Sequence, residues 1–463
     1  MALGKRTDVA QPLFVCSADL PGVTPNPFYD AVNKVLASHQ FDPFVEGICG
    51  KFYHSSMGRP GLAPGIYFRC LLVGYFESLE SERGIAWRCG DSKSLGLFLG
   101  YAVDEKTPDH STISRTRRLI DLETHEEVFA YVLKILANHG LIEGKTIGVD
   151  STTLEANAAL RSIVRRDTGQ SYQDFLTELA KASGIETPTR EDLAKLDRKR
   201  KNKGNNDEWQ NPNDPDAKIT KMKDGTTHLA HKAEHAVDFD SGVILAVNIC
   251  DAVAGDTKTI CDTINQASEN LRAIADDKRV GGKISPDWAS EAVADKGYHS
   301  NGIMMDLREM RLRSYISEPD RGRRRWADKE NGADAQSATY ANRRRIKGER
   351  GKALMRKRGE LLERSFAHNY ETGAMRRLHL RHRDNIAKRV LIHTAGCNLG
   401  LLMRVKFGMF KPRRLKKATV CAPMVIMVPW TWLTRVVSHI NQLSLAMWTL
   451  DQRLGGVCAV QLV

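Results

Sequence analysis

Two short β-prone segments that each end in an aspartate constrain this chain more than any other feature of its sequence. The first covers residues 145–150 and ends at Asp150, directly before a hydroxyl-rich turn. The second covers residues 291–295 and ends at Asp295. Runs of β-favouring residues of this length predict strands. One acid after a strand often serves only as a turn residue or a helix cap, but the repeated pattern favours a site built from both carboxylates.

The sequence around these segments predicts a mixed α/β core. The expected elements are strands over 227–238 and 243–247, joined by a tight turn, helices over 256–274 and 301–310, and a last strand over 313–317. Three antiparallel strands followed by helical crossovers are typical of an RNase H-like fold. We therefore expect an RNase H-like mixed-sheet catalytic core, with both acids at strand ends near the centre of the sheet.

The rest of the chain suggests four regions. They are an N-terminal arm (1–26), a helical N-terminal domain (27–140), a catalytic domain (141–405) with basic insertions at about 154–226 and 317–349, and a C-terminal tail (406–463) of unknown role. Within the first insertion, residues 154–183 look helical and polar, and a basic run follows. The tail is either an added interaction segment or the product of a shifted reading frame.

One helix of the N-terminal domain is a candidate for contact with DNA. A proline, a capping acid and hydroxyls precede a helix that presents Arg115, Arg117 and Arg118. Such a helix suits contacts with phosphates or entry into the major groove. The alternative is a capped surface helix whose arginines are solvated.

The charge of the chain favours a polyanionic partner. Its 69 Lys and Arg residues outnumber 56 Asp and Glu residues, which gives a formal charge of +13. The surplus is concentrated in residues 197–223 and 307–389. Clustered basic residues of this kind favour nucleic acid over an acidic small molecule.

The cysteines and the apolar runs predict a cytoplasmic protein. The nine cysteines are scattered and form no Cys-x-x-Cys pair, which is typical of reduced thiols. The N-terminus lacks the apolar core of a signal peptide. The apolar run over 420–433 is short and contains Pro423 and Pro429, so no membrane association is expected.

A metal site built on Asp150 and Asp295 needs a third carboxylate. Phosphoryl transfer by two metal ions roughly 3.5–4 Å apart requires several converging anionic oxygens. Glu363 is the candidate, because it lies beside a helical seam formed by Leu362 and Phe366. Glu360 and Glu371 are rivals, and ion pairing within a basic helix is the alternative role for all three.

Several motifs together resemble one known family. They are Gly58-Arg59-Pro60, Ser81-Glu82-Arg83, Pro108-Asp109-His110-Ser111-Thr112, Val149-Asp150-Ser151-Thr152, residues 231–238, Ala294-Asp295-Lys296-Gly297-Tyr298 and residues 363–368. In this order they resemble the bacterial insertion-sequence DDE transposases, and the resemblance covers roughly residues 40–405. It implies that Asp150, Asp295 and Glu363 are catalytic and bind two Mg²⁺ ions, for which Mn²⁺ can substitute.

The resemblance also implies an activity and partners. The protein is expected to bind the terminal inverted repeats of its own element, to cleave DNA and to transfer the freed strand into target DNA. Two ends must be brought together, so a homodimer in a nucleoid-associated synaptic complex is expected. The sequence departs from a signature of some relatives, because Arg356, Gly359 and Tyr370 stand where Tyr, Arg and Lys are usual. Arg358 and Arg364 are possible substitutes for those contacts with DNA.

Other basic and aromatic residues are further candidates for DNA contacts. Lys296 and Arg364 flank the acids, and Arg323, Arg324 and Arg325 precede Trp326, an aromatic residue suited to stacking on an unpaired base. The alternative for Trp326 is that it packs a surface loop. The basic stretch over 343–358 is expected to bind the DNA backbone.

Some readings compete with this assignment. A zinc site on His228, His231 and His235 is disfavoured, because on a strand only His231 and His235 share a face and no cysteine joins them. A catalytically decayed or domesticated transposase that only binds DNA is the main alternative function. A different RNase H-like nuclease or a resolvase is the third.

Overall fold

The fold is described from a computed structural model. Its described residues are 22–412, except for short gaps at 55–57, 59, 201–203, 223–224, 278–279, 281–283, 286–287, 321, 323 and 327–330. Most of the predicted arm and tail, the apolar run over 420–433, Arg59 and Arg323 therefore lie outside the described residues. None of the described helices is both long and apolar enough to cross a membrane.

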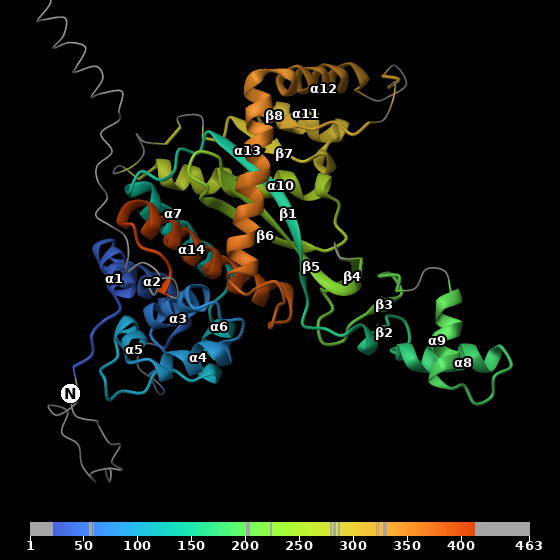
Figure 1. Ribbon diagram of the computed structural model, residues 1–463, viewed down its shortest axis with the longest axis horizontal. Helices are drawn as coiled ribbons and strands as arrows, with labels where there is room; N and C mark the ends of the chain where they lie inside the picture. The colour runs from blue at the N-terminus through green and yellow to red at the C-terminus, as the bar shows by residue number, and fades with distance from the viewer. Residues whose placement is uncertain are drawn as a thin grey trace, which may run out of the picture. The chain divides into compact units, whose positions relative to one another are not determined.

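A mixed sheet occupies the centre of the described chain (Figure 1). Its main strands are β1 (Thr146–Glu155), β5 (Thr227–Asp238), β6 (Ile244–Asp251), β7 (Glu291–Ala294) and β8 (Arg313–Ile316). The order across the sheet is β6-β5-β1-β7-β8, and β4 (Lys218–Lys221) pairs with the start of β5. β6, β5 and β1 are mutually antiparallel, whereas β7 and β8 run parallel to β1. The expected mixed α/β core is confirmed.

Helices cover both faces of this sheet. α10 (Asp256–Ala275) and α11 (Asn301–Glu309) are the crossovers that lead to the parallel strands. α13 (Glu349–Phe366) crosses the opposite face, where Leu354 and Leu361 pack against Val293 of β7. α14 (Arg383–Phe407) lies on the same face as α13, since its Cys397 packs beside Leu362. Each face of β1 therefore meets a different set of helices.

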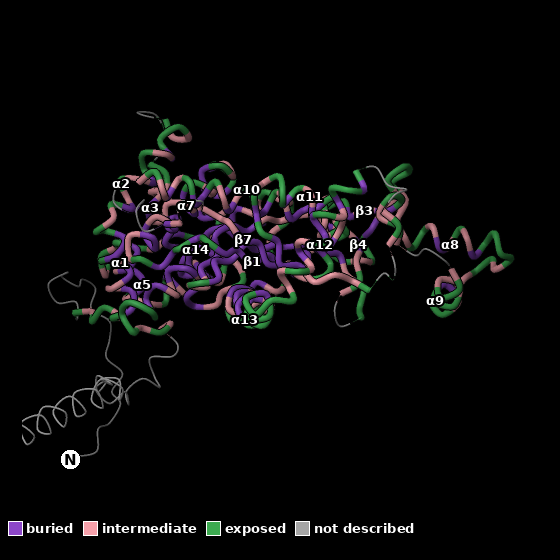
Figure 2. Tube along the Cα trace, turned by 90° about the horizontal axis from the view of Figure 1, so that it is seen from above, coloured by how far each residue is buried: buried purple, intermediate pink, exposed green. Residues whose placement is uncertain are grey.

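The helical N-terminal region packs directly against α14. Its helices are α1 (Pro27–Ser38), α2 (Phe41–Cys49), α3 (Pro64–Phe76), α4 (Glu82–Asp91), α5 (Lys93–Leu99), α6 (His110–Leu119) and α7 (Leu122–Asn138). Arg389 of α14 is buried and donates hydrogen bonds to the carbonyls of Leu71 and Leu79. Figure 2 shows the buried trace continuing through α3, α7 and α14 to β1 and β7.

The start of the first insertion differs in secondary structure from the prediction. β1 continues to Glu155, because it pairs with β5 along its whole second half and Leu378 N donates to the Glu155 carbonyl. The expectation of helix from residue 154 was therefore wrong. The insertion contains β2 (Val164–Arg165), α8 (Tyr172–Ala182), α9 (Arg190–Lys199) and β3 (Trp209–Gln210). It has a small core around Leu176 and Leu193, and a second cluster around Trp209 that also includes Leu229 of β5.

The second insertion extends the edge of the sheet. α12 (Gly332–Lys347) follows β8 and precedes α13. The Asn342 side chain accepts a hydrogen bond from Ile316 N at 3.1 Å and donates one to the Ile316 carbonyl at 2.8 Å. The side-chain amide therefore satisfies backbone groups that an edge strand otherwise leaves unpaired.

Candidate active site

β1 and β7 bring the two predicted aspartates together. The strands pair in parallel with Val149 opposite Ala294, so Asp150 and Asp295 follow side by side. Asp295 is the first residue after β7, but Asp150 lies in the middle of β1. The expectation that both acids end strands was wrong for Asp150, because β5 continues to pair with β1 beyond the end of β7. Both side chains leave the sheet on the face covered by α13.

Arg358 of α13 reaches both carboxylates. Its Nη1 lies 3.5 Å from Asp150 Oδ2, and its Nη2 lies 3.6 Å from Asp295 Oδ1. The side chains of Arg358, Asp150 and Asp295 remain 20%, 25% and 45% exposed. One cationic group therefore contacts both acids through long ion pairs at a site that solvent reaches.

Regularly spaced side chains place α13 on the sheet. Arg350 pairs with the buried Glu291 at the start of β7, Arg358 follows two turns later, and the Ser365 hydroxyl lies 3.3 Å from His235 Nδ1. A helix with 3.6 residues per turn puts Glu363 about 140° round the axis from Arg358. Glu363 is accordingly exposed, and it has no ion-pair partner among the described residues.

The two rival acids, Glu360 and Glu371, form ion pairs with arginines and not with the Arg358 that contacts the aspartates. Glu360 pairs with Arg364 at 3.4 Å, and Glu371 pairs with Arg376 at 3.7 Å. Among the described residues, the three predicted metal ligands do not converge to within 4.8 Å of one another. The structure thus brings Asp150 and Asp295 together and leaves Glu363 apart from them.

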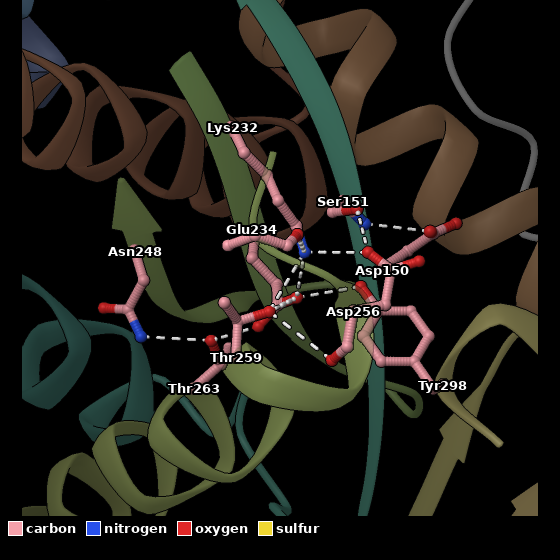
Figure 3. A network of polar contacts seen from close by, with 10 residues as sticks. Asp150, Ser151, Lys232, Glu234, Asn248, Asp256, Thr259, Thr263 and Tyr298 are labelled. Atoms are coloured by element: carbon pink, nitrogen blue, oxygen red, sulfur yellow. Dashed lines mark hydrogen bonds and ion pairs between the residues drawn. The ribbon is translucent and has the colours of Figure 1, made fainter. Parts of the chain in front are cut away.

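A buried polar network occupies the opposite face of β1 (Figure 3). Glu234 of β5 is fully buried and lies beside Ser151 in the sheet. Its carboxylate accepts hydrogen bonds from Thr259 Oγ1 at 2.7 Å and Thr263 Oγ1 at 2.5 Å, both on α10, and from Tyr298 Oη at 2.9 Å. These donors replace the solvent that the carboxylate loses on burial.

Lys232 balances part of the charge of this network. Its Nζ donates to Asp256 Oδ1 at 2.7 Å and to Thr259 Oγ1 at 3.0 Å, and lies 3.5 Å from Glu234 Oε1. Asp256 also accepts a hydrogen bond from Ser151 Oγ at 3.2 Å. Burial, followed by the charges of Glu234 and Asp256, raises the pKa of Tyr298 far above its usual value. The phenol therefore stays protonated and acts as a hydrogen-bond donor.

Arg376 contacts Thr152, the next residue of β1 after Asp150 whose side chain lies on the α13 side of the sheet. Its Nη1 donates to Thr152 Oγ1 at 2.9 Å, and its own side chain is 40% exposed. The carbonyl of the same residue accepts a hydrogen bond from Glu155 N at 3.1 Å. The segment after α13 is therefore fixed to the second half of β1.

The predicted DNA-contact residues fall into two groups. Arg115, Arg118, Lys296, Arg325 and Arg364 are exposed. Arg117 is buried against Glu82 at 2.7 Å, and Arg324 pairs with Glu318 at 2.6 Å. Trp326 is half-buried, with its ring 6.3 Å from that of Tyr340. The interactions of Arg117 and Arg324 inside the protein leave the exposed group as the better candidates for DNA.

The histidines of β5 have different surroundings. His235 is fully buried, its Nε2 lies 2.7 Å from Tyr370 Oη, and burial lowers its pKa to about 3. His231 Nε2 lies 3.1 Å from Asp214 Oδ2, and His228 is partly exposed near Glu155. Among the described residues, these three histidines do not form a cluster of potential metal ligands.

A separate group of possible metal ligands has a structural role. Asp214, Asp216 and His382 place their ligand atoms within 4.8 Å of one another. Asp214 Oδ1 accepts from His382 N at 3.1 Å and Asp216 Oδ2 accepts from Arg383 N at 3.0 Å, at the first turn of α14. The carboxylates satisfy free amides at a helix N-terminus, which is a favourable position for negative charge.

Sequence reasoning missed the Glu234 network, Arg350 and Arg376. A signal existed for the first of these, because Lys232 and Glu234 lie two residues apart on one face of a strand and are flanked on that face by Ala230 and Ala236. Charged residues in such positions are rarely buried without partners. No pattern in the sequence distinguishes Arg350 and Arg376 from the many other arginines of residues 343–383.

Two family models match the chain. The model described as a transposase DDE domain matches residues 149–400, which is more than half of the 463 residues and includes both aspartates. The model described as a transposase domain (DUF772) matches residues 21–119, within the helical N-terminal region. No curated protein and no solved structure matches the chain.

Proposed function

The chain belongs to the DDE transposases, and on that premise we propose that it cleaves DNA at the ends of its own mobile element and transfers the freed strands into target DNA. The observation that carries this proposal is the side-by-side placement of Asp150 and Asp295 on one face of the sheet. Carboxylates from neighbouring strands can share cations, as Arg358 illustrates by contacting both.

The strand order supports an RNase H-like core. Three antiparallel strands, β6, β5 and β1, are followed by two parallel strands reached through α10 and α11. α13 then returns across the sheet beside both acids. This is the arrangement expected when acids from two adjacent strands and a helix form one site.

The donor set fits divalent metal ions of the harder kind. Carboxylate oxygens suit Mg²⁺ and Mn²⁺, and a guanidinium already contacts both acids. Asp150 and Asp295 would hold two Mg²⁺ ions, with Glu363 as the third carboxylate. Such ions supply Lewis-acid activation of the attacking hydroxyl and neutralisation of charge at the phosphate.

Glu363 can complete the site only after a rearrangement. Its side chain is exposed and turned away from the face of α13 that carries Arg358. A rotation of α13 or a change at the π-helical turn Ala367–Glu371, which follows it directly, would be required. Irregular turns of this kind are common at functional sites. We propose that DNA binding supplies the energy for this movement.

The chain's own cations orient the DNA. Lys296 follows Asp295 and is exposed, and Arg364 is exposed at the end of α13. Arg115 and Arg118 on α6, with Arg325 and Trp326 before α12, are proposed to contact the terminal inverted repeats. Contacts with phosphates make such binding strongly dependent on salt. Two protomers are proposed to bring the element ends together.

A cleavage assay tests the proposed function. The protein is incubated with Mg²⁺ and DNA that carries the terminal repeats of its own locus, beside the variants Asp150→Asn and Asp167→Asn. Asp167 is an exposed acid of the insertion that pairs with Arg165, so its variant is the matched control. The parent and Asp167→Asn should cleave, and Asp150→Asn should bind without cleaving. Binding without cleavage by the parent would instead support a decayed transposase.

A further inference from the structure

Both predicted catalytic aspartates are followed closely by a residue of the buried network. Ser151 comes directly after Asp150, and Tyr298 is the third residue after Asp295. Tyr298 ends the short helical turn Lys296–Tyr298, which starts where β7 has ended. The backbone of each aspartate is therefore tied to the network on the far face of the sheet.

The two ties meet at neighbouring carboxylates. Tyr298 Oη donates to Glu234 Oε1, and Ser151 Oγ donates to Asp256 Oδ1. Lys232 Nζ lies between these carboxylates, 2.7 Å from Asp256 and 3.5 Å from Glu234. Glu234 is also held by two hydroxyls of α10. The network thus links β1, β5, the start of α10 and the turn after β7 through one buried centre.

The turn after Asp295 has little room to move toward α10. A Cβ atom added to Gly297 would lie 2.7 Å from Asp256 Oδ2. The turn therefore packs directly on a carboxylate of the network. Any displacement of Asp256 or Tyr298 would shift the backbone that carries Asp295.

From these contacts we infer that Glu234 and Tyr298 are positioning residues that set the spacing between Asp150 and Asp295. The inference rests on the proposed function in assuming that the two aspartates hold metal. Mg²⁺ demands a nearly ideal octahedral arrangement of oxygens at about 2.0–2.1 Å. Supporting contacts must hold such ligands to within roughly 0.5 Å.

Tyr298→Phe tests this role with a minimal change. It removes one hydroxyl and leaves the ring buried. Tyr315→Phe is the matched control, because Tyr315 Oη also donates to a buried glutamate, Glu291, at 3.3 Å, but at the start of β7 and away from the aspartates. The first measurement is the Mn²⁺ dissociation constant of the DNA-free protein. The second is cleavage with Mg²⁺ and with Mn²⁺.

Tyr298→Phe should weaken Mn²⁺ binding about threefold to tenfold, which corresponds to roughly 0.7–1.4 kcal/mol. Its cleavage rate should fall further with Mg²⁺ than with Mn²⁺, because Mg²⁺ tolerates displaced ligands less. Tyr315→Phe should match the parent in both measurements. A loss of stability alone would lower both cleavage rates by the same factor.

Thr263 provides a second test if Tyr298→Phe fails to fold. Thr263→Val removes a donor to Glu234 with little change in shape, and Thr263→Ser retains the hydroxyl. Thr263→Val should bind Mn²⁺ more weakly than the parent, and Thr263→Ser should bind Mn²⁺ as tightly as the parent. Mn²⁺ binding equal to that of the parent in both Tyr298→Phe and Thr263→Val would overturn the inference. Because Mn²⁺ binding is read without DNA, failure of the parent to cleave would count against the proposed function and not against this role.

Discussion

On one face of β1, Asp150 and Asp295 have long ion pairs with Arg358 and remain open to solvent. On the other face, Glu234 is fully buried and accepts three hydrogen bonds from hydroxyl groups. The two sets of acids are close in the sheet, because Glu234 of β5 lies opposite Ser151, the residue that follows Asp150 on β1. They differ in how completely the acids are satisfied by the protein itself.

The roles proposed for the acids account for this difference. Under the proposed function Asp150 and Asp295 exchange partners when metal and substrate bind, and their ion pairs with Arg358 are accordingly long. A buried carboxylate without donors would instead cost several kcal/mol. The face of β1 that α10 covers (the buried face) therefore supplies three hydroxyl donors to Glu234. It becomes a rigid support for the face that carries Asp150 and Asp295 (the open face). Substitutions on the two faces should separate activity from stability.

Asp295→Asn should have the largest effect on activity. Loss of one of the two carboxylates proposed to bind metal would remove several kcal/mol of transition-state stabilisation, so cleavage should fall by about a thousandfold or more. The melting temperature should stay close to that of the parent, because the ion pair with Arg358 is long and exposed. Gel-based cleavage and thermal melting are the measurements. Asp306→Asn, at an exposed acid of α11, should change neither.

Glu363→Gln should affect cleavage and not metal binding by the free protein. In the DNA-free structure Glu363 faces away from the aspartates, so Mn²⁺ binding without DNA should equal that of the parent. Cleavage should fall by about a hundredfold if Glu363 joins the site only on DNA. Glu360→Gln, which removes an exposed pair with Arg364, is the control. Full cleavage by Glu363→Gln would remove Glu363 from the proposed site.

The open face shows how far the sequence alone leads. The order of strands and the two aspartates could be predicted, because β-prone runs, a tight turn and a repeated pattern are local features. The orientation of Glu363 could not. The predicted seam of Leu362 and Phe366 permits several rotations of the helix, and packing of Leu354 and Leu361 on β7 selects the one that points Arg358 at the acids.

The buried face was less accessible to sequence reasoning. The predicted hairpin covers Lys232 and Glu234, but their partners Asp256, Thr259 and Tyr298 are distant in sequence. Which polar residues meet across a sheet depends on the register of the strands and on the angle of α10. Neither quantity is set by local composition.

Glu234→Ala should have the largest effect on stability. Removal of one member of a buried ionic network typically costs about 3 kcal/mol or more, which corresponds to a drop in melting temperature of roughly 4–6 °C for a chain of this size. Glu269→Ala replaces an exposed glutamate on α10 and should lower the melting temperature by far less. Equal shifts in the two variants would show that the donors around Glu234 do not depend on its charge.

Arg358→Gln should strengthen metal binding by the free protein. The guanidinium contacts both aspartates and would compete with a metal ion for them, and its removal leaves two carboxylates without that cation. An increase in Mn²⁺ affinity of about tenfold, or 1.4 kcal/mol, is expected. Calorimetric titration measures it. Arg364→Gln, whose parent residue pairs with Glu360 on the exposed side of α13, should leave the affinity unchanged.

Acid should destabilise the protein moderately through two buried histidines. One, His235, lies on the open face of β1, and the other, His125, lies in α7. Burial lowers the pKa of His235, the neighbour of Asp150 on β5, to about 3, and that of His125 in α7 to about 4. Their ordinary value is near 6.5. Between these values the unfolded chain binds more protons than the folded one, so stability rises with pH and is lost as pH falls below about 6.5.

At pH 5.5 this difference amounts to about 1.4 kcal/mol for each histidine, relative to pH 7.5. The melting temperature of the parent should therefore fall over this range. His235→Asn, which cannot gain a proton in this range, should show a smaller fall between the two pH values, whatever its stability at pH 7.5. An unchanged pH dependence would mean that His235 binds protons equally in the folded and the unfolded protein, with a pKa near the ordinary value in both. In that case His235 would add a second cation beside Asp150 at acid pH, and the contrast between the two faces would be weaker than the contacts indicate.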